Sequence, residues 1–234
     1  FEYIMLEPAG SMSSTASDMA NFMLAHLSGG AYNGGRILKE VTLKEMHKQH
    51  FTYDPTLGGM TLGLMQGVFN EKEVLFHGGS TMLYNTGLYL VPEENTGVFI
   101  SYSGGNHLLH SEVFQEYMDC FYPIYDPIKV VPGEGSRERA KKFIGEYQMN
   151  RKSVTTDEKI AGILAGGIIN VAISEDGYLL VTNCGETNQF VEIEPGVYQN
   201  LREGRTQDAF GPFHKIIFKT DPMGRIMLTT DGPM

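Results

Sequence analysis

The 234-residue chain is long enough for one large domain or two modest ones, and its 41% hydrophobic and 20% charged residues are typical of a globular protein with a sizeable core. A formal net charge of -10 without a basic stripe argues against nucleic acid as a partner. Two cysteines, Cys120 and Cys184, make no disulfide framework, and no apolar run reaches the roughly 18–20 residues that span a bilayer.

The first half predicts two helices before any long strand. Apolar side chains recur at helical spacing within residues 15–27, and Thr15 and Asp18 stand at capping-box spacing at the start of this segment. Thr42 and Glu45 have the same spacing, which predicts a second, short helix over 42–49. Residues 58–69 are rich in glycine and methionine and are expected to be extended.

Three strands are expected next, over 73–79, 85–91 and 96–103. The turn-forming run Pro92–Asn95 predicts that the last two form an antiparallel hairpin. Residues 106–121 place apolar side chains on one side of a helix. We therefore expect antiparallel strands with helices against one face.

The second half is expected to be a separate β-domain. Prolines and glycines between residues 123 and 135 predict a linker, and a short basic helix comes after it over 137–142. Short strands and turns then alternate at even spacing, which favours a small, closed or nearly closed antiparallel barrel. The expected division is 1–122 for the first domain, 123–142 for linker and helix, and 143–234 for the barrel.

Several segments of the first half resemble the serine β-lactamase-related hydrolases, which include class C β-lactamases, penicillin-binding proteins and DD-peptidases. The segment Ser13–Met23 resembles the Ser-Thr-x-x-Asp-Met helix of that family, and Phe76–Gly79 resembles its third active-site motif. Pro92–Glu94 and Gly97–Ser101 resemble the family's next two strands, which come after that motif. The resemblance implies an α/β (α+β) fold of which this chain carries the C-terminal part, joined to a lipocalin-like barrel.

The resemblance also implies site residues. In the family's third motif, a strand edge supplies a cationic or hydrogen-bonding side chain and a backbone N–H for the oxyanion. His77, Gly79 and the N–H of Ser80 would take these catalytic roles. The residues expected to touch substrate are Gly78, Thr81, Met82 and Tyr84.

The first two motifs of the family are missing from this sequence. No serine is followed three residues later by lysine, and the one Tyr-x-Asn, Tyr198–Asn200, lies after the third motif. We expect these motifs on an N-terminal segment of the same protein that is not supplied here, so this chain alone should be inactive. Its implied substrate is a D-Ala-D-Ala-type peptide, a β-lactam or an ester.

Other interpretations of the sequence stay open. His77 could be an ordinary strand histidine, and the whole protein could be a non-catalytic binding or scaffolding protein that uses the barrel as its interaction module. A carrier barrel is a third possibility, although a barrel packed with side chains is favoured. The helical spacing of His47 with His50 and of His107 with His110 lacks accompanying carboxylates or cysteines, so no metal or cofactor is expected. The resemblance suggests the cell surface or periplasm, with possible membrane attachment beyond the C-terminus.

Overall fold

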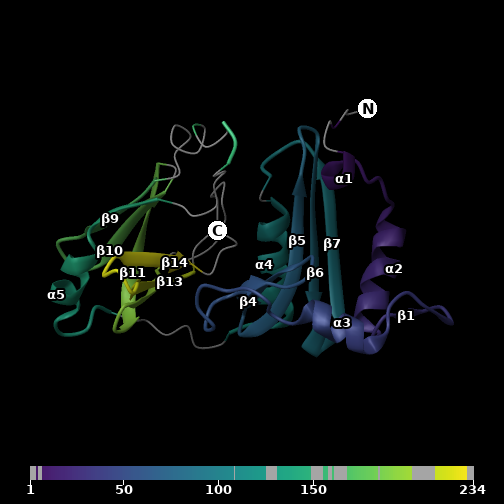
Figure 1. Cartoon of the computed structure of the whole chain (residues 1–234), viewed down its shortest axis with the longest axis horizontal. Helices are drawn as coiled ribbons and strands as arrows, with labels where there is room; N and C mark the ends of the chain where they lie inside the picture. The colour runs from purple at the N-terminus through teal and green to yellow at the C-terminus, as the bar shows by residue number, and fades with distance from the viewer. Residues whose placement is uncertain are drawn as a thin grey trace. The chain divides into compact units, whose positions relative to one another are not determined.

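The computed structural model describes residues 4, 7–107, 109–124, 131–148, 155–157, 160, 168–183, 185–201 and 214–230. The chain divides into two compact units, Phe1–Tyr125 and Asp126–Met234 (Figure 1). Each unit is described by itself.

The first unit is built on a five-stranded antiparallel sheet of order β3-β4-β5-β6-β7. Its strands are β3 (Gly59–Met60), β4 (Met65–Phe69), β5 (Lys72–Ser80), β6 (Tyr84–Val91) and β7 (Thr96–Ser103). A separate two-stranded hairpin consists of β1 (Ala31–Tyr32) and β2 (Gly35–Arg36). The three long strands β5, β6 and β7 therefore confirm the strands expected from the sequence.

Helices pack on both faces of this sheet, so the expectation that they lie against one face is wrong. The helical elements of the unit are α1 (Glu7–Gly10), α2 (Ala16–Leu27), α3 (Glu40–His47), the 3-10 turn η1 (Pro92–Glu94) and α4 (Leu109–Phe121). Met23 of α2 packs with Leu75, Leu88 and Leu90 on one face. On the other face, Phe114 and Met118 of α4 pack with the residues Val74, Tyr89 and Val91. These are the α2 face and the α4 face of the sheet.

The start of α2 follows the predicted capping chemistry, whereas the start of α3 does not. The Thr15 hydroxyl accepts a hydrogen bond from the Asp18 N–H at 3.1 Å, as an N-cap does. The prediction that Thr42 starts the next helix is wrong, because α3 begins at Glu40 after an extended Lys39 that makes no side-chain cap. A Glu40–Lys44 ion pair of 2.7 Å stabilises this first turn instead.

The second unit is a seven-stranded antiparallel meander of order β14-β13-β12-β11-β10-β9-β8. Its strands are β8 (Gly145–Gln148), β9 (Ile168–Ile173), β10 (Leu179–Asn183), β11 (Glu186–Glu194), β12 (Val197–Asn200), β13 (Lys215–Thr220) and β14 (Ile226–Thr230). The sheet is barrel-like. It is nearly and not fully closed, because within the described residues no hydrogen-bonded pairing joins β8 to β14. The predicted fold class, mixed helices and strands followed by a small antiparallel barrel, is confirmed.

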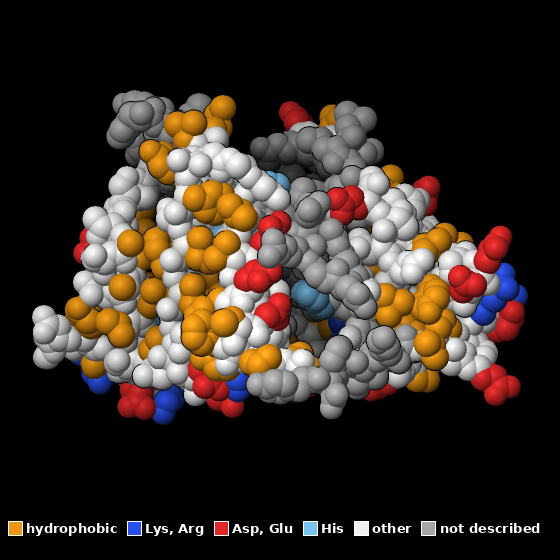
Figure 2. All heavy atoms as spheres, turned by 180° about the vertical axis from the view of Figure 1, so that it is seen from behind, with side chains coloured by type: hydrophobic (Ala, Val, Ile, Leu, Met, Phe, Trp, Pro, Cys, Tyr) orange, Lys and Arg blue, Asp and Glu red, His pale blue; other side chains and the backbone are white. Residues whose placement is uncertain are grey.

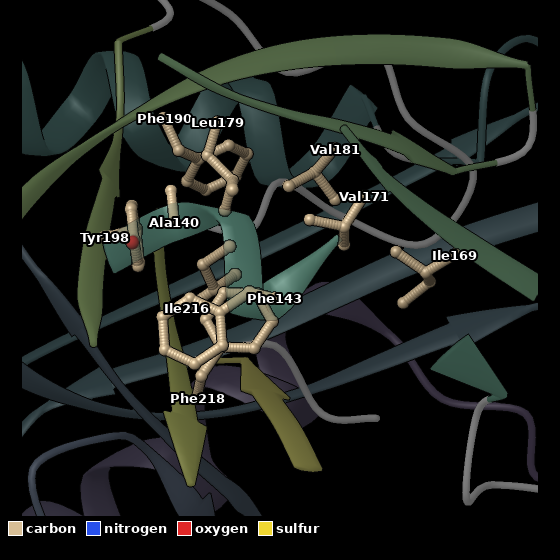
Figure 3. Packing of buried hydrophobic residues seen from close by; sticks show 10 residues of the cluster. All are labelled: Ala140, Phe143, Ile169, Val171, Leu179, Val181, Phe190, Tyr198, Ile216 and Phe218. Carbon is tan, nitrogen blue, oxygen red and sulfur yellow. The ribbon is translucent and has the colours of Figure 1, made fainter. Parts of the chain in front are cut away.

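A short helix and aromatic side chains fill this barrel-like sheet. The helix α5 (Ser136–Ala140) and the turn η2 (Lys141–Phe143) bring Ala140 and Phe143 into the core (Figure 3). The Phe143 ring stacks on Phe218 with centroids 4.2 Å apart, and Tyr198 meets Phe218 edge to face. The interior drawn in Figure 3 is thus packed with side chains.

Candidate active site

Strand β5 changes from an inner strand to an edge strand in its middle. As far as Phe76 it pairs with β4 on one side and with β6 on the other. The β4 pairing ends at Met65–Phe76, whereas the β6 pairing continues to Ser80–Asn85. Among the described residues, the segment from His77 to Ser80 therefore has one unpaired edge. We call this segment the open edge of β5.

The direction of the backbone groups along the open edge follows from the register. The Thr81 N–H donates to the Tyr84 carbonyl at 2.8 Å, so residue 81 is bonded toward β6. In an antiparallel pair, bonded and non-bonded residues alternate along the strand. The N–H and C=O groups of Gly78 and Ser80 therefore point away from β6, toward the open edge. This is the direction in which an oxyanion donor at Ser80 would have to point.

The side chains of the open edge alternate between the two faces of the sheet. His77 lies opposite Leu88 on the α2 face, and its imidazole is exposed. The described residues offer His77 no hydrogen-bond partner. Gly79 is next on the same face, where a Cβ atom would come within 2.7 Å of the Thr86 hydroxyl. The imidazole thus stands at the rim of the sheet, next to a stretch of bare backbone.

Gly78 faces the opposite side of the sheet, where its neighbour is a ring of the same chain. It pairs with Gly87 on β6, and the ring of His110 from α4 lies over both glycines. His110 Nδ1 is 2.6 Å from the hydroxyl oxygen of Tyr89, which is buried. A bare backbone at Gly78 therefore accommodates an imidazole of the same chain on the α4 face.

Burial shifts the titration of this pair. Burial is the main cause that lowers the pKa of His110, with a smaller contribution from His107. Burial likewise raises the pKa of the Tyr89 hydroxyl. Both groups are therefore neutral near pH 7. A neutral pair that packs tightly behind the open edge holds β5 and β6 in place without adding charge.

The remaining predicted residues form the tip of the β5–β6 hairpin. The Thr81 hydroxyl accepts from the Tyr84 N–H at 3.0 Å, which tightens the turn. Met82 is 91% exposed and Tyr84 is 55% exposed. The Ser80 hydroxyl donates to the buried Asn85 side chain at 2.7 Å. The Ser80 hydroxyl is therefore engaged in supporting the hairpin, while its N–H faces the open edge.

Sequence reasoning missed His110 and Tyr89. The His107–His110 spacing draws attention to metal binding, but the described residues contain no cluster of three possible metal ligands. The pair Gly78 and Gly87 could have indicated His110, since two glycines in adjacent strands leave room for a bulky ring. None of the helices in the described part of the chain is long and apolar enough to cross a bilayer.

Comparison with known proteins finds a similarity over most of the first unit. A family model described as Beta-lactamase matches residues 1–109. The search of curated proteins gives no match. Among solved structures, SurE with D-Leu matches with a TM-score of 0.50 and 13% identity, over 93% of this chain and 48% of SurE.

A penicillin-binding protein homologue from Pyrococcus abyssi, described as octameric, gives a TM-score of 0.41 and 15% identity, over 93% of this chain and 45% of that protein. The chain thus spans about half the length of the solved structures it matches. The family model bears out the resemblance seen in the sequence: residues 1–109, just under half of the chain, are similar to the family described as Beta-lactamase.

Proposed function

We propose that this chain is part of a serine acyl-transfer hydrolase and supplies the third active-site motif, while the nucleophile belongs to a segment outside these 234 residues. The open edge of β5 carries the proposal. It combines an exposed imidazole at His77 with outward-facing N–H groups at Gly78 and Ser80. An acyl group that lies along this edge can reach both a hydrogen-bonding side chain and a backbone donor.

The Ser80 N–H is the proposed oxyanion donor. Hydrogen bonds aimed at the position where negative charge develops stabilise the transition state more than the ground state, and losing one such donor costs about 2.7–4 kcal/mol. The donor needs a fixed strand, and three features hold β5 here: the β6 ladder, the Ser80–Asn85 hydrogen bond and the His110 ring behind Gly78. The backbone donor is therefore preorganised in the absence of substrate.

His77 is proposed to orient the substrate or to tune the transition state. The proposed substrates are D-Ala-D-Ala-type or other D-amino-acid peptides, β-lactams and esters. SurE, whose fold is similar, has been solved with D-Leu, so D-amino-acid peptides belong in the substrate panel. Such a substrate places the enzyme outside the cytoplasm.

The test uses the full-length protein that includes the polypeptide upstream of residue 1. We expect His77→Ala to lower kcat/KM for a chromogenic cephalosporin or a p-nitrophenyl ester by about 100-fold, a typical contribution of a positioned hydrogen-bonding or proton-transfer group. Ser80→Ala keeps the N–H and should change the rate much less, and His214→Ala in the second unit is the matched histidine control. An unchanged rate in His77→Ala would refute the role of the imidazole. No turnover by the full-length protein would instead favour a binding or scaffolding protein.

A further inference from the structure

Buried polar side chains are more informative about function than exposed apolar ones. Figure 2 shows many exposed apolar side chains on the face that it draws, which is usual for a folded protein. A buried polar side chain, in contrast, needs a hydrogen-bond partner, and its partners show what it holds in place. Asn85 of β6 is such a residue, because it is 5% exposed and its side chain makes hydrogen bonds to two other segments.

Asn85 is the middle residue of a row that crosses three adjacent strands. The register places Ser80 of β5 opposite Asn85, and Asn85 opposite Tyr102 of β7. Residues opposite each other in a sheet share a face, and Ser80 lies two positions after Gly78, which faces His110 on the α4 face. We call Ser80, Asn85 and Tyr102 the polar row. It crosses the strands β5, β6 and β7 of Figure 1 on the α4 face of the sheet.

Two members of the polar row bind the loop between β7 and α4. Asn85 Nδ2 donates to the Gly104 carbonyl at 3.4 Å, and the Tyr102 hydroxyl donates to the Asn106 carbonyl at 2.6 Å. The Gly104 N–H in turn donates to the Leu83 carbonyl at the tip of the β5–β6 hairpin at 2.9 Å. The loop and the hairpin that carries the open edge of β5 are therefore fixed to each other.

The direction of the Asn85 amide follows from its two partners. A carbonyl group such as that of Gly104 can only accept, so the Nδ2 group must face it. The Oδ1 atom then faces Ser80 and accepts from its hydroxyl at 2.7 Å. Both ends of the amide are used, and neither an apolar side chain nor an ionised carboxylate could make both bonds.

Ser80 depends on this bond more than its neighbours do. Its N–H and C=O groups point to the open edge and not to β6, and the pairing with β4 has already ended at Phe76. The backbones of the residues on either side, 79 and 81, bond to β6. Among the described residues, the bond to Asn85 is therefore the hydrogen bond that joins Ser80 itself to β6.

We propose that Asn85 is a positioning residue for the acyl-transfer reaction. Through the Ser80 hydroxyl it fixes the direction of the Ser80 N–H, and through the Gly104 carbonyl it makes this direction depend on the β7–α4 loop. The inference rests on the function proposed above, in which the Ser80 N–H stabilises the oxyanion. A misaligned donor loses hydrogen-bond energy that is gained only in the transition state, so loss of the Asn85 amide should lower kcat and change KM little.

The test uses the full-length protein, which includes the polypeptide upstream of residue 1, and a p-nitrophenyl ester. Asn85→Ala should lower kcat about three- to tenfold, the effect of one hydrogen bond. Ser80→Ala removes the other partner of the same bond at an exposed position and should lower kcat by a similar factor. The double variant should be no slower than the slower single variant, because both changes act through one bond. Rates are taken per active site from the burst of p-nitrophenol, so partial unfolding does not imitate the effect.

Two glycines with the same backbone conformation test the role of the loop. Gly104 has φ +68° and Gly34 of the β1–β2 turn has φ +77°, and a Cβ atom on either would meet nothing within 4 Å. Alanine at either position therefore introduces similar backbone strain without a clash. Gly104→Ala should lower kcat about as much as Asn85→Ala, because it shifts the carbonyl that Asn85 binds. Gly34→Ala is the matched control and should keep the original kcat.

The outcomes separate this inference from the proposed function. No turnover by the full-length protein overturns both. Turnover that His77→Ala lowers, but that Asn85→Ala and Ser80→Ala leave unchanged, overturns only the role of Asn85. So does a raised KM with an unchanged kcat, because Asn85 would then act on substrate binding. Effects that multiply in the double variant, or equal losses in Gly34→Ala and Gly104→Ala, also overturn it.

Discussion

The contact between His110 and the two opposed glycines makes a sharp prediction about Gly87. A Cβ atom at this position would lie 2.6 Å from His110 Nδ1 and 2.7 Å from Tyr89 Cε2. Both neighbours are rings, and the Tyr89 ring is itself stacked on Phe114 with centroids 3.9 Å apart. Neither ring can move by the required distance without repacking the α4 face. Gly87→Ala should therefore destabilise the first unit.

The size of the effect can be estimated from three contributions. Overpacking a well-packed core costs about 1–3 kcal/mol. Displacing His110 also removes its hydrogen bond to Tyr89, which contributes about 0.5–1.5 kcal/mol. Replacing glycine with alanine recovers about 0.4–1 kcal/mol by restricting the unfolded chain. We expect a net loss of about 2–3 kcal/mol, since the first two contributions outweigh the third.

Gly78→Ala is the matched control on the opposing strand. Its Cβ would lie 3.4 Å from His110 Cε1 and 3.5 Å from Nε2, which is ordinary van der Waals contact. The restriction of the unfolded chain then dominates, so this variant should be neutral or slightly stabilised. Gly87→Ala combined with His110→Ala should regain part of the loss, because the ring that the new methyl group meets is absent.

The assay is amide hydrogen exchange measured on peptides from β5 and β6, with peptides from β10 and β11 of the second unit as the internal reference. Two units need not unfold together, so a local measurement is preferable to one global transition. Gly87→Ala should speed exchange in β5 and β6 and leave the reference peptides unchanged. Equal effects of Gly78→Ala and Gly87→Ala would refute the packing argument.

Two further predictions concern charged and titratable groups. Burial is the main cause that lowers the pKa of His26 to about 4, and the adjacent His47 adds to it, so the unfolded chain binds a proton that the folded chain does not. The free energy of unfolding of the first unit should therefore fall by roughly 1–3 kcal/mol as the pH falls from about 6.5 to about 4. In His26→Gln, urea unfolding at a series of pH values should show a flatter curve over this range. An unchanged slope would contradict the assignment. In the second unit, Glu192 is buried and its carboxylate accepts three hydrogen bonds from Arg139, the shortest of which joins Nη2 to Oε2 at 2.6 Å. Arg139→Ala should lower the Tm of this unit, because it leaves a buried carboxylate without its partner. The double variant Arg139→Ala with Glu192→Leu should recover most of the lost Tm. A Tm that Arg139→Ala leaves unchanged would show that the ion pair does not hold α5 on the barrel.

The strands could be predicted from sequence because their signals are local. Alternating apolar residues bounded by Pro92–Asn95 define β6 and β7 almost to the residue. Asn95 adopts φ 50°, a left-handed conformation that asparagine tolerates, so the turn itself is encoded locally. The start of α3 was misplaced because Thr42 and Glu45 match a capping box whose geometry the chain does not use. The helix instead begins two residues earlier, at Glu40, where the Glu40–Lys44 ion pair stabilises its first turn and Leu43 is buried.

The candidate site was predictable only in part, because the open edge of β5 depends on residues far apart in the chain. The motif His77–Gly79 is visible in the sequence, but the point at which β4 stops pairing with β5 is not. This point depends on the tight turn before Met65, where the Thr61 N–H donates to the Leu64 carbonyl. The same turn that starts β4 thus leaves the later part of β5 unpaired. An open edge is a property of the sheet, and no single segment encodes it.

The two glycines of the motif show that a motif in the sequence does not reveal the neighbours of each of its residues. A strand alternates its faces, so Gly78 and Gly79 cannot serve the same neighbour. Gly78 accommodates His110 on the α4 face, whereas Gly79 leaves the α2 face bare beside the imidazole of His77. Gly78 therefore faces a ring of its own chain that an added methyl group would only touch, whereas Gly79 is the glycine that we propose lets a substrate approach. It follows that Gly79→Ala should impair substrate binding while Gly78→Ala should not, even though the two residues are adjacent in the motif.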